Sequence, residues 1–365
     1  MPAKPRSEVF DANEVGVYHC WNRIVRRLFL FGIDWLTGKD CRHRKEWVRE
    51  QYRTLAGVMA IQVLDYTILD NHLHVVLRNR PDIVQSWSDD EVARRWWRVC
   101  PKRRARDGSP AEPTEGELAK LLANIGEYRK RLSDISWMMR LAQQRVARRA
   151  NKEDDVDGRF FAKRFDCERL PDEASVLNCS LYVDLNWIHA GMADTPEASR
   201  YTSAYERIQA RWRKMNHEMS ADASPCVDTS VDDDWLAPIF LDERADAYVG
   251  PATDSLTGEP STKQALSDSS FASEEASEQA ESQPLFSNPI GARRVSDKGF
   301  LPMTLDEYLQ LLDTVGRAIR QDKRAAIPAE LPPILERLGL KPRQWLTSIV
   351  DNFKSQPNLC SPAPS

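Results

Sequence analysis

Two alternating runs joined by a short turn constrain the fold of this chain more than any other feature. Residues 63–68 and 72–77 place apolar side chains at every second position, which predicts two strands with one face on a core. The turn at residues 69–71 predicts that they pair as a hairpin. The alternating positions are Leu64, Tyr66 and Ile68 in the first run, and Leu73, Val75 and Leu77 in the second.

His72 and His74 open the second of these strands and point the same way, because side chains two residues apart share a face. At about 3.3 Å of rise per residue, the two imidazoles lie roughly 6 to 7 Å apart and can reach a single metal ion. Two hydrogen-bonded surface histidines would leave the same pattern. The pair alone therefore leaves both interpretations open.

Further elements surround this strand pair. The sequence predicts a strand at residues 15–25, helices at 44–60 and 132–150, and a strand within 158–170. A third helix is expected at residues 173–190, after the acidic start signal Asp-Glu and before a stop signal at glycine.

The third helix carries a polar row beside its apolar stripe. Tyr182 and Asn186 are four residues apart, so they present a phenol and an amide oxygen at one point. A tyrosine and asparagine pair is more often boundary packing than a site. The apolar stripe is Ala174, Leu177, Leu181, Leu185 and Ile188, and the polar row is Asn178, Tyr182, Asn186 and His189.

Charge divides the chain into two parts. Residues 1–217 carry 38 Lys and Arg against 31 Asp and Glu, a net of +7, whereas residues 218–365 carry 13 against 24, a net of −11. The basic part is the candidate for contact with a polyanion. The seven cysteines form no Cys-x-x-Cys pair, which favours reduced thiols in a cytoplasm over a disulfide framework or a zinc ribbon. With no signal-peptide core and no apolar run of about 18 residues, we expect a soluble protein that is not exported.

A basic insertion is expected at residues 85–130. Arg94, Arg95 and Arg98 interleave with Trp96 and Trp97, a combination that suits phosphate neutralisation and base stacking. A solvated amphipathic helix that buries a tryptophan against the domain explains the same residues equally well.

Taken together, these features resemble the single-tyrosine His-hydrophobic-His (HUH) nucleases, and specifically the REP-associated tyrosine transposases. The resemblance covers about residues 12–212, and four motifs occur in the family's order. The matching segments are residues 18–23 (Tyr-His-Cys-Trp-Asn-Arg), 71–74 (Asn-His-Leu-His), 158–165, 182–192 and 200–205.

The resemblance implies an α+β fold with a ferredoxin-like antiparallel sheet and packed helices, and it implies cleavage of single-stranded DNA by transesterification. Tyr182 would attack a phosphodiester to give a covalent 5′-phosphotyrosine. A divalent metal, Mg²⁺ or Mn²⁺, would be held by His72, His74 and Asn186. The expected partner is single-stranded or hairpin repeat DNA in a cytoplasmic, nucleoid-associated setting, with a homodimer left open. The expected DNA-contacting residues are Arg23, Arg26, Arg94, Arg95, Arg98, Lys163, Arg164 and His189.

Two positions depart from the family pattern. Trp187 stands where the family has proline, so the helix is expected to continue toward Gly191. His189 replaces a basic residue, and a place at the helix end, where it stabilises carbonyls, is favoured over contact with phosphate or metal. Two other functions fit parts of this pattern: a DNA-binding protein that no longer cuts, and a metal-dependent hydrolase or structural metal site. The latter is disfavoured because no acidic cluster accompanies the histidines.

The rest of the chain is expected to hold less structure. Residues 218–298 have the composition of an acidic disordered linker, with one apolar island at 235–241 that can dock on the nuclease domain of residues 1–217. A small helical module for DNA binding or packing is expected at 299–356, followed by a disordered tail at 357–365.

Overall fold

The computed structural model describes residues 10–11, 13–106, 108–218, 232–241, 294–318 and 324–339. Its strands are β1 (Gly16–Arg23), β2 (Ile61–Ile68), β3 (His72–Asn79) and β4 (Asp166–Leu170). Its α-helices are α1 (Arg44–Val58), α2 (Pro81–Ser86), α3 (Asp89–Val99), α4 (Glu115–Leu122), α5 (Ile125–Leu132), α6 (Ile135–Asp154), α7 (Glu173–His189), α8 (Ser203–Glu218), α9 (Leu305–Gly316) and α10 (Ile334–Arg337). Short 3₁₀ helices lie at Val25–Arg27 (η2) and Pro196–Ala198 (η3).

The four strands form one antiparallel sheet in the order β2-β3-β1-β4. With α1 between β1 and β2, and α6 before β4, this is the strand order of a ferredoxin-like β-α-β-β-α-β fold. The predicted α+β fold class is confirmed. The strand expected within 158–170 is shorter than the prediction, because β4 begins only at Asp166.

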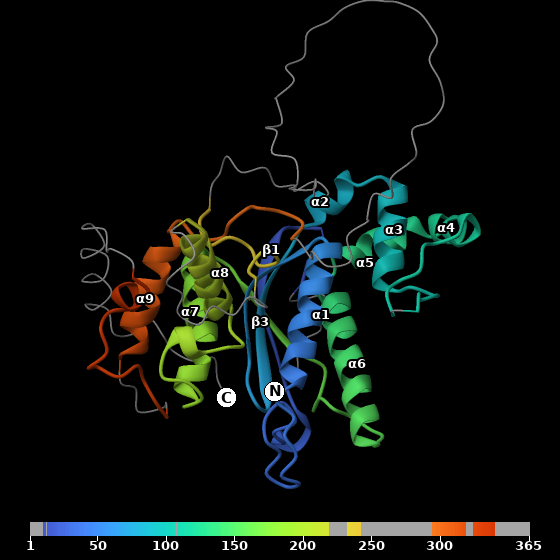
Figure 1. Cartoon of the computed structure of the whole chain (residues 1–365). Helices are drawn as coiled ribbons and strands as arrows, with labels where there is room; N and C mark the ends of the chain where they lie inside the picture. The colour runs from blue at the N-terminus through green and yellow to red at the C-terminus, as the bar shows by residue number, and fades with distance from the viewer. Residues whose placement is uncertain are drawn as a thin grey trace, which may run out of the picture.

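One face of the sheet packs on α1 and α6, which lie side by side (Figure 1). Tyr18 and Val75 project from the sheet into this layer, where they join Tyr52 of α1 and Met139 of α6 in one buried cluster. The alternation of apolar residues along β1 and β3 builds this face.

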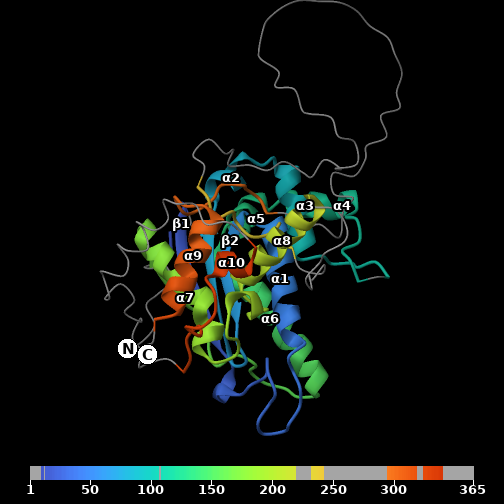
Figure 2. The ribbon, with the colours of Figure 1, turned by 60° about the vertical axis from the view of Figure 1, so that its left-hand side comes forward.

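The other face is covered by α7, with α8 and α9 beside it (Figures 1 and 2). Leu64 and Val76 of the sheet share a second buried cluster with Leu181 of α7 and Leu309 of α9. The strand pair is therefore buried on both faces, whereas the alternation predicted a core on one face alone. The difference arises because helices from late in the chain cover the side that carries the polar positions.

Segments from beyond residue 230 complete the edge of the sheet at β2. The backbone amide of Ala237 donates to the Val63 carbonyl at 2.8 Å, and the Gln62 side chain donates to the Ser296 carbonyl at 2.9 Å. Trp235 is fully buried. The apolar island at 235–241 thus docks on the core, as the sequence suggested. Residues 219–231 and 242–293 of the expected linker lie outside the described residues.

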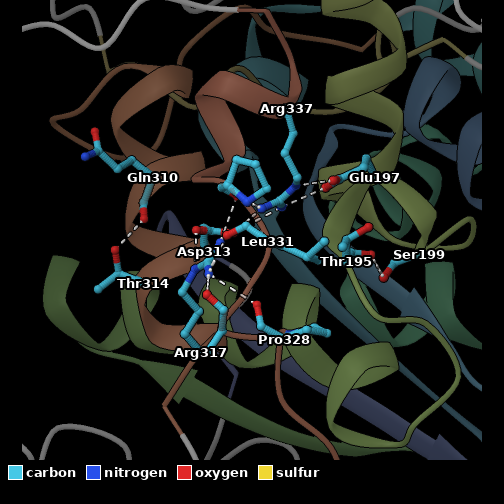
Figure 3. A network of polar contacts seen from close by, with 12 residues as sticks. Thr195, Glu197, Ser199, Gln310, Asp313, Thr314, Arg317, Pro328, Leu331 and Arg337 are labelled. Carbon is cyan, nitrogen blue, oxygen red and sulfur yellow. Dashed lines mark hydrogen bonds and ion pairs between the residues drawn. The ribbon is translucent and has the colours of Figure 1, made fainter.

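Within residues 299–356, the structure describes 299–318 and 324–339, which include α9 and α10. A polar network joins these helices to η3 (Figure 3). Arg337 of α10 donates to Asp313 of α9 at 3.0 Å and to Glu197 of η3 at 3.2 Å. These contacts fasten α10 to the same side of the molecule as α7. The tail at 357–365 lies outside the described residues.

The insertion at 85–130 folds as helices α3, α4 and α5 after α2. Trp96 and Trp97 are buried, and Trp96 stacks on Tyr128 with ring centroids 4.9 Å apart. Of the two alternatives for this segment, the packed amphipathic helix is the one observed, and neither tryptophan is exposed for base stacking.

No described helix is long and apolar enough to cross a membrane.

Candidate functional site

Two adjacent strands bring a group of histidines onto the sheet face that α7 covers. In the antiparallel register of β1 and β3, Trp21 lies opposite His74 and Arg23 lies opposite His72. Because side chains alternate along a strand, His19 shares the face of Trp21 and Arg23. The local strand pairing thus gathers the imidazoles of His19, His72 and His74.

Helix α7 adds a phenol to this group. The ring of Tyr182 stands edge-on to His74, with centroids 5.5 Å apart and an interplanar angle of 88°, and its centroid lies 6.3 Å from that of His19. The His72 and His74 rings are 5.2 Å apart. His74 and Tyr182, 108 positions apart in the sequence, therefore meet within one chain.

The ends of α7 are set by local sequence. The Asp172 side chain accepts a hydrogen bond from the Ser175 amide at 2.7 Å and caps the start of the helix. The end follows at Gly191, whose φ of 69° is a left-handed conformation that glycine adopts without strain. Trp187 continues the helix as expected, and its indole donates to the Ile68 carbonyl of β2 at 2.9 Å.

The surroundings of Tyr182 act on its ionisation in opposite directions. Burial raises the pKa of the phenol, while the neighbouring Asn186 side chain and the positive charge of Arg23 lower it. The net pKa is above the usual value. A nucleophilic Tyr182 therefore needs additional positive charge close to its oxygen.

Both histidines of the predicted metal motif use Nδ1 for a hydrogen bond within the protein. Nδ1 of His72 lies 2.6 Å from Oδ1 of Asn71, and Nδ1 of His74 lies 2.9 Å from Nε2 of His19. An amide oxygen only accepts, so His72 carries its proton on Nδ1 and has a lone pair on Nε2. Burial, followed by the charge of Arg23, lowers the pKa of His72 to about 4, so this imidazole is neutral at pH 7 and suited to coordination.

The donors present fit the divalent cation that the resemblance implies. Nε2 of His72 and Nε2 of His74 would be the coordinating atoms, because Nδ1 of each ring is hydrogen-bonded within the protein, and Asn186 is buried beside Tyr182. The Asn186 Nδ2 atom is buried and has no hydrogen-bond partner among the described residues. Since a half-turn of the amide exchanges nitrogen and oxygen, this position suits an oxygen ligand.

Histidine, cysteine and carboxylate side chains alone would not complete such a site. Over the described ranges, no group of three or more of these residues is placed to hold a metal ion. A cation held by His72 and His74 would thus take its other ligands from Asn186 and from phosphate or water oxygens.

A pocket of about 200 Å³ opens beside His72, lined by Arg23, Arg27, Asn71 and His72. The backbone amide of the residue after Arg23, Ile24, donates to the Asn71 carbonyl at 2.8 Å, which ties the two sides of the pocket together. Two arginines that line a small opening favour an anionic group such as a phosphodiester.

The loop that follows β1 holds its arginines in an unusual backbone conformation. Arg26 and Arg27 have φ values of 54° and 58°, in the left-handed region that non-glycine residues adopt rarely. Both side chains are exposed. Strain at consecutive residues next to a pocket is consistent with a loop shaped for ligand contact.

Lys163 and Arg164, predicted to contact DNA, lie close to this loop. The Ala162 amide donates to the Arg23 carbonyl at 2.9 Å, and the Asn22 side chain donates to the Lys163 carbonyl at 3.1 Å. Both basic side chains are exposed, and Lys163 forms an ion pair with Asp166 at 2.8 Å.

The structure does not bring Arg94, Arg95 and Arg98 to the pocket. Strand β3 begins at His72 and ends next to α2, so α3 lies beyond the opposite end of the sheet (Figure 1). Arg95 is buried, with its guanidinium 4.1 Å from the Trp87 ring centroid and 3.0 Å from the Val58 carbonyl. Burial lowers the pKa of Arg98 to about 10. Arg95 in particular serves packing within the fold.

His189 is buried in the last turn of α7, and its carbonyl accepts a hydrogen bond from the Arg324 amide at 3.1 Å. His189 therefore lies at the end of the helix, which is the place that the sequence favoured for it.

His19 is the site residue to which the sequence assigned no role. It stands within the matched segment 18–23, and alternation along β1 places it on the face of Arg23. That face assignment was the available signal, but it indicates a contact only once β1 is known to pair with β3.

A buried charged group beneath the site was also missed. Asp65 of β2 pairs with Arg207 of α8 at 2.7 Å and accepts a hydrogen bond from Ser180 at 2.5 Å. Asp184 of α7 accepts a hydrogen bond from the Tyr308 hydroxyl of α9 at 2.7 Å. Single acidic residues within apolar stretches were the signal for this group.

No protein-family model and no curated protein sequence matches the chain. One solved structure, described as "Structure of the REP associates tyrosine transposase bound to a REP hairpin", aligns with 63% of this chain and 96% of that chain. The sequence identity is 10% and the TM-score is 0.33. A likeness at this level carries no weight for function, which has to rest on the site residues themselves.

Proposed function

We propose that the protein is a metal-dependent, single-stranded DNA transesterase of the transposase type, with Tyr182 as its nucleophile. The observation that supports this function best is the meeting of Tyr182, His72, His74 and Asn186 beside a pocket with two arginines. Boundary packing explains a tyrosine on α7 but does not explain a pair of imidazoles opposite it.

The reaction forms one phosphodiester and breaks another. The Tyr182 hydroxyl gives up its proton to solvent, and its oxygen attacks the phosphorus atom. The bond between phosphorus and the 3′ oxygen breaks, so the downstream strand stays on Tyr182 through its 5′ phosphate. The upstream strand leaves with a 3′ oxygen that takes up a proton. Because a phosphodiester replaces a phosphodiester, no nucleotide hydrolysis is needed and the step can reverse.

The residues of the chain have separate tasks in this step. His72, His74 and Asn186 would hold the divalent cation, which supplies positive charge to the phosphoryl oxygens when bound. Arg23 lowers the pKa of Tyr182 and lines the pocket, so it favours both the phenolate and the phosphate. Arg27 lies on the other side of the same opening.

A single strand suits the site better than a duplex. Tyr182 is only partly exposed on a helix that faces the sheet, so the reacting phosphate has to enter beside His72. A flexible strand can bend its backbone into such an opening, and basic side chains near the opening can contact its phosphates.

The test uses single-stranded hairpin oligonucleotides from the neighbourhood of the gene, labelled at either end, with Mn²⁺ or EDTA. We expect a denaturation-resistant adduct that keeps the 3′ label, requires Mn²⁺ and disappears in Tyr182→Phe. Tyr128→Phe, in α5, is the matched control and should form the adduct normally. Tight binding of a cognate hairpin without any adduct would favour the DNA-binding protein that does not cut.

A further inference from the structure

We propose that His19 is a positioning residue for His74, whose ring it holds with Nε2 presented for coordination to a divalent cation. The inference rests on the proposed function, because it assigns a role within the same site. It adds a residue that the sequence motif His-x-His does not include.

The geometry places His19 directly behind His74. Nε2 of His19 lies 2.9 Å from Nδ1 of His74, and the two rings stack with centroids 5.1 Å apart and planes inclined by 15°. The Trp21 ring contacts His19 at a centroid distance of 4.8 Å. His19 is 8% exposed and lies on a central strand, so little movement is open to it.

The direction of the hydrogen bond follows from the chemistry of imidazole. A neutral imidazole carries one proton, on Nδ1 or on Nε2. Coordination through Nε2 of His74 requires the proton on Nδ1, and Nε2 of His19 is the acceptor that it meets.

His72 is supported in the same way by a different element. Its Nδ1 donates to Oδ1 of Asn71, in the turn between β2 and β3. Both motif histidines therefore have Nδ1 hydrogen-bonded within the protein, so Nε2 is the atom through which each would coordinate a cation. Hydrogen bonds of this kind orient metal-binding histidines and increase their basicity.

A positioning role fits His19 better than a role as a third ligand. Its Nε2 atom is already engaged with His74. In the part of the chain that the structure describes, three histidine, cysteine or carboxylate side chains nowhere converge as a metal site. Of the three histidines, His72 and His74 are thus the candidate ligands, and His19 supports His74.

The experiment compares His19→Phe, which keeps a ring but removes the acceptor, with His19→Gln, which keeps an acceptor oxygen. Mn²⁺ affinity is measured by isothermal titration calorimetry on the full chain. The His74 tautomer is read from its ¹⁵N chemical shifts in metal-free protein. We expect His19→Phe to lower Mn²⁺ affinity by about 10- to 100-fold and to shift the His74 proton away from Nδ1. His19→Gln should keep that tautomer and stay within a few-fold of the original affinity.

Three comparisons make the outcome decisive. His43→Phe, at an exposed histidine of the loop before α1, is the matched control and should leave Mn²⁺ affinity unchanged. An unchanged His74 tautomer and affinity in His19→Phe, or equal losses in both His19 variants, would overturn the positioning role. If His72→Ala keeps full Mn²⁺ affinity, the metal site of the proposed function fails instead, and the His74 tautomer in His19→Phe still decides the role of His19.

Discussion

At the scale of single residues, two buried carboxylates lie close together next to the site: Asp65 of β2 and Asp184 of α7. Asp65 and Asp184 share one guanidinium, that of Arg207, so the fully ionised group would carry a net negative charge inside the protein. Burial, followed by the charge of Asp65, raises the pKa of Asp184 to about 7. Such a group costs free energy when it ionises in the folded state.

The sign of the pH effect follows from this shift. The unfolded Asp184 loses its proton near pH 4, whereas the folded one keeps it until about pH 7. The contribution of Asp184 to stability is therefore complete below pH 4 and is lost as the pH rises to 7. We expect Asp184→Asn to stabilise the protein at pH 8 by roughly 1–3 kcal/mol, since its amide can still accept from Ser203 and donate to Tyr308.

Urea unfolding at several pH values from 4 to 8 measures this effect. The gain of Asp184→Asn over the original chain should grow with pH and level off above 7. Asp194→Asn, at an exposed position, should show no such trend. A constant difference at every pH would contradict the raised pKa.

At the scale of elements, the position of α7 decides whether the site exists. Its ends, its tyrosine and its asparagine were predictable from caps and four-residue spacing. Its burial was not, because α7 lies between the sheet and α9 and is covered on two sides. Ala174, assigned to the core stripe, is exposed, while Ser180 and Asp184 are buried with polar partners from other elements. Local periodicity detects one apolar stripe and cannot reveal partners that are distant in the sequence.

Trp187 anchors the last turns of α7 to the end of β2. Its indole donates to the Ile68 carbonyl, and the ammonium of Lys45 lies 4.5 Å from its ring centroid. We expect Trp187→Ala to destabilise the protein by roughly 3–5 kcal/mol through the cavity that it leaves. Trp187→Phe should cost about 1–3 kcal/mol, because the buried Ile68 carbonyl loses its donor.

Chemical denaturation of both Trp187 variants tests the anchor, and adduct formation under native conditions tests its effect on Tyr182. Trp35→Ala, at a largely exposed tryptophan, is the control and should change stability little. Equal stability of Trp187→Phe and the original chain would mean that the indole hydrogen bond does not matter.

The basic insertion shows a different limit of sequence reasoning. The pattern of Arg and Trp in α3 fits either an amphipathic helix packed on the domain or a DNA surface, and the sequence does not decide between them. The structure buries Trp96 and Trp97 and engages Arg95 with Glu91 at 2.6 Å. Which side of a helix meets the core depends on neighbours from α5 and α6 that no local window contains.

At the scale of the whole molecule, the C-terminal region takes part in the core that holds Tyr182. Leu309 and Leu312 of α9 pack with Leu185 of α7, and the Tyr308 hydroxyl reaches Asp184. The sequence predicted a helical module at 299–356, and within it the structure places α9, which begins after a capping box of Thr304 and Glu307. It left the partner of α9 open, since packing between residues more than 120 positions apart is invisible to composition.

Tyr308 offers a direct measure of this long-range contact. We expect Tyr308→Phe to lower stability by about 1–2 kcal/mol, because Asp184 loses one donor in a site closed to water. In a double-mutant cycle with Asp184→Asn, measured by urea unfolding, the two changes should not be additive. Strict additivity would mean that the two side chains do not interact in solution.

The edge of the sheet at β2 also has a consequence for how the protein is made. Gln62 lies in β2, and the Ser296 carbonyl that it binds is 234 residues further along the chain. A ribosome that adds about 5–20 residues per second needs roughly 10–50 s to make the intervening chain. Until Ala237 and Ser296 have both been made, part of the nascent β2 edge has no covering segment and can pair with other chains. Slower translation between these two segments should therefore increase misassembly during synthesis, and chaperones that bind exposed strands should reduce it.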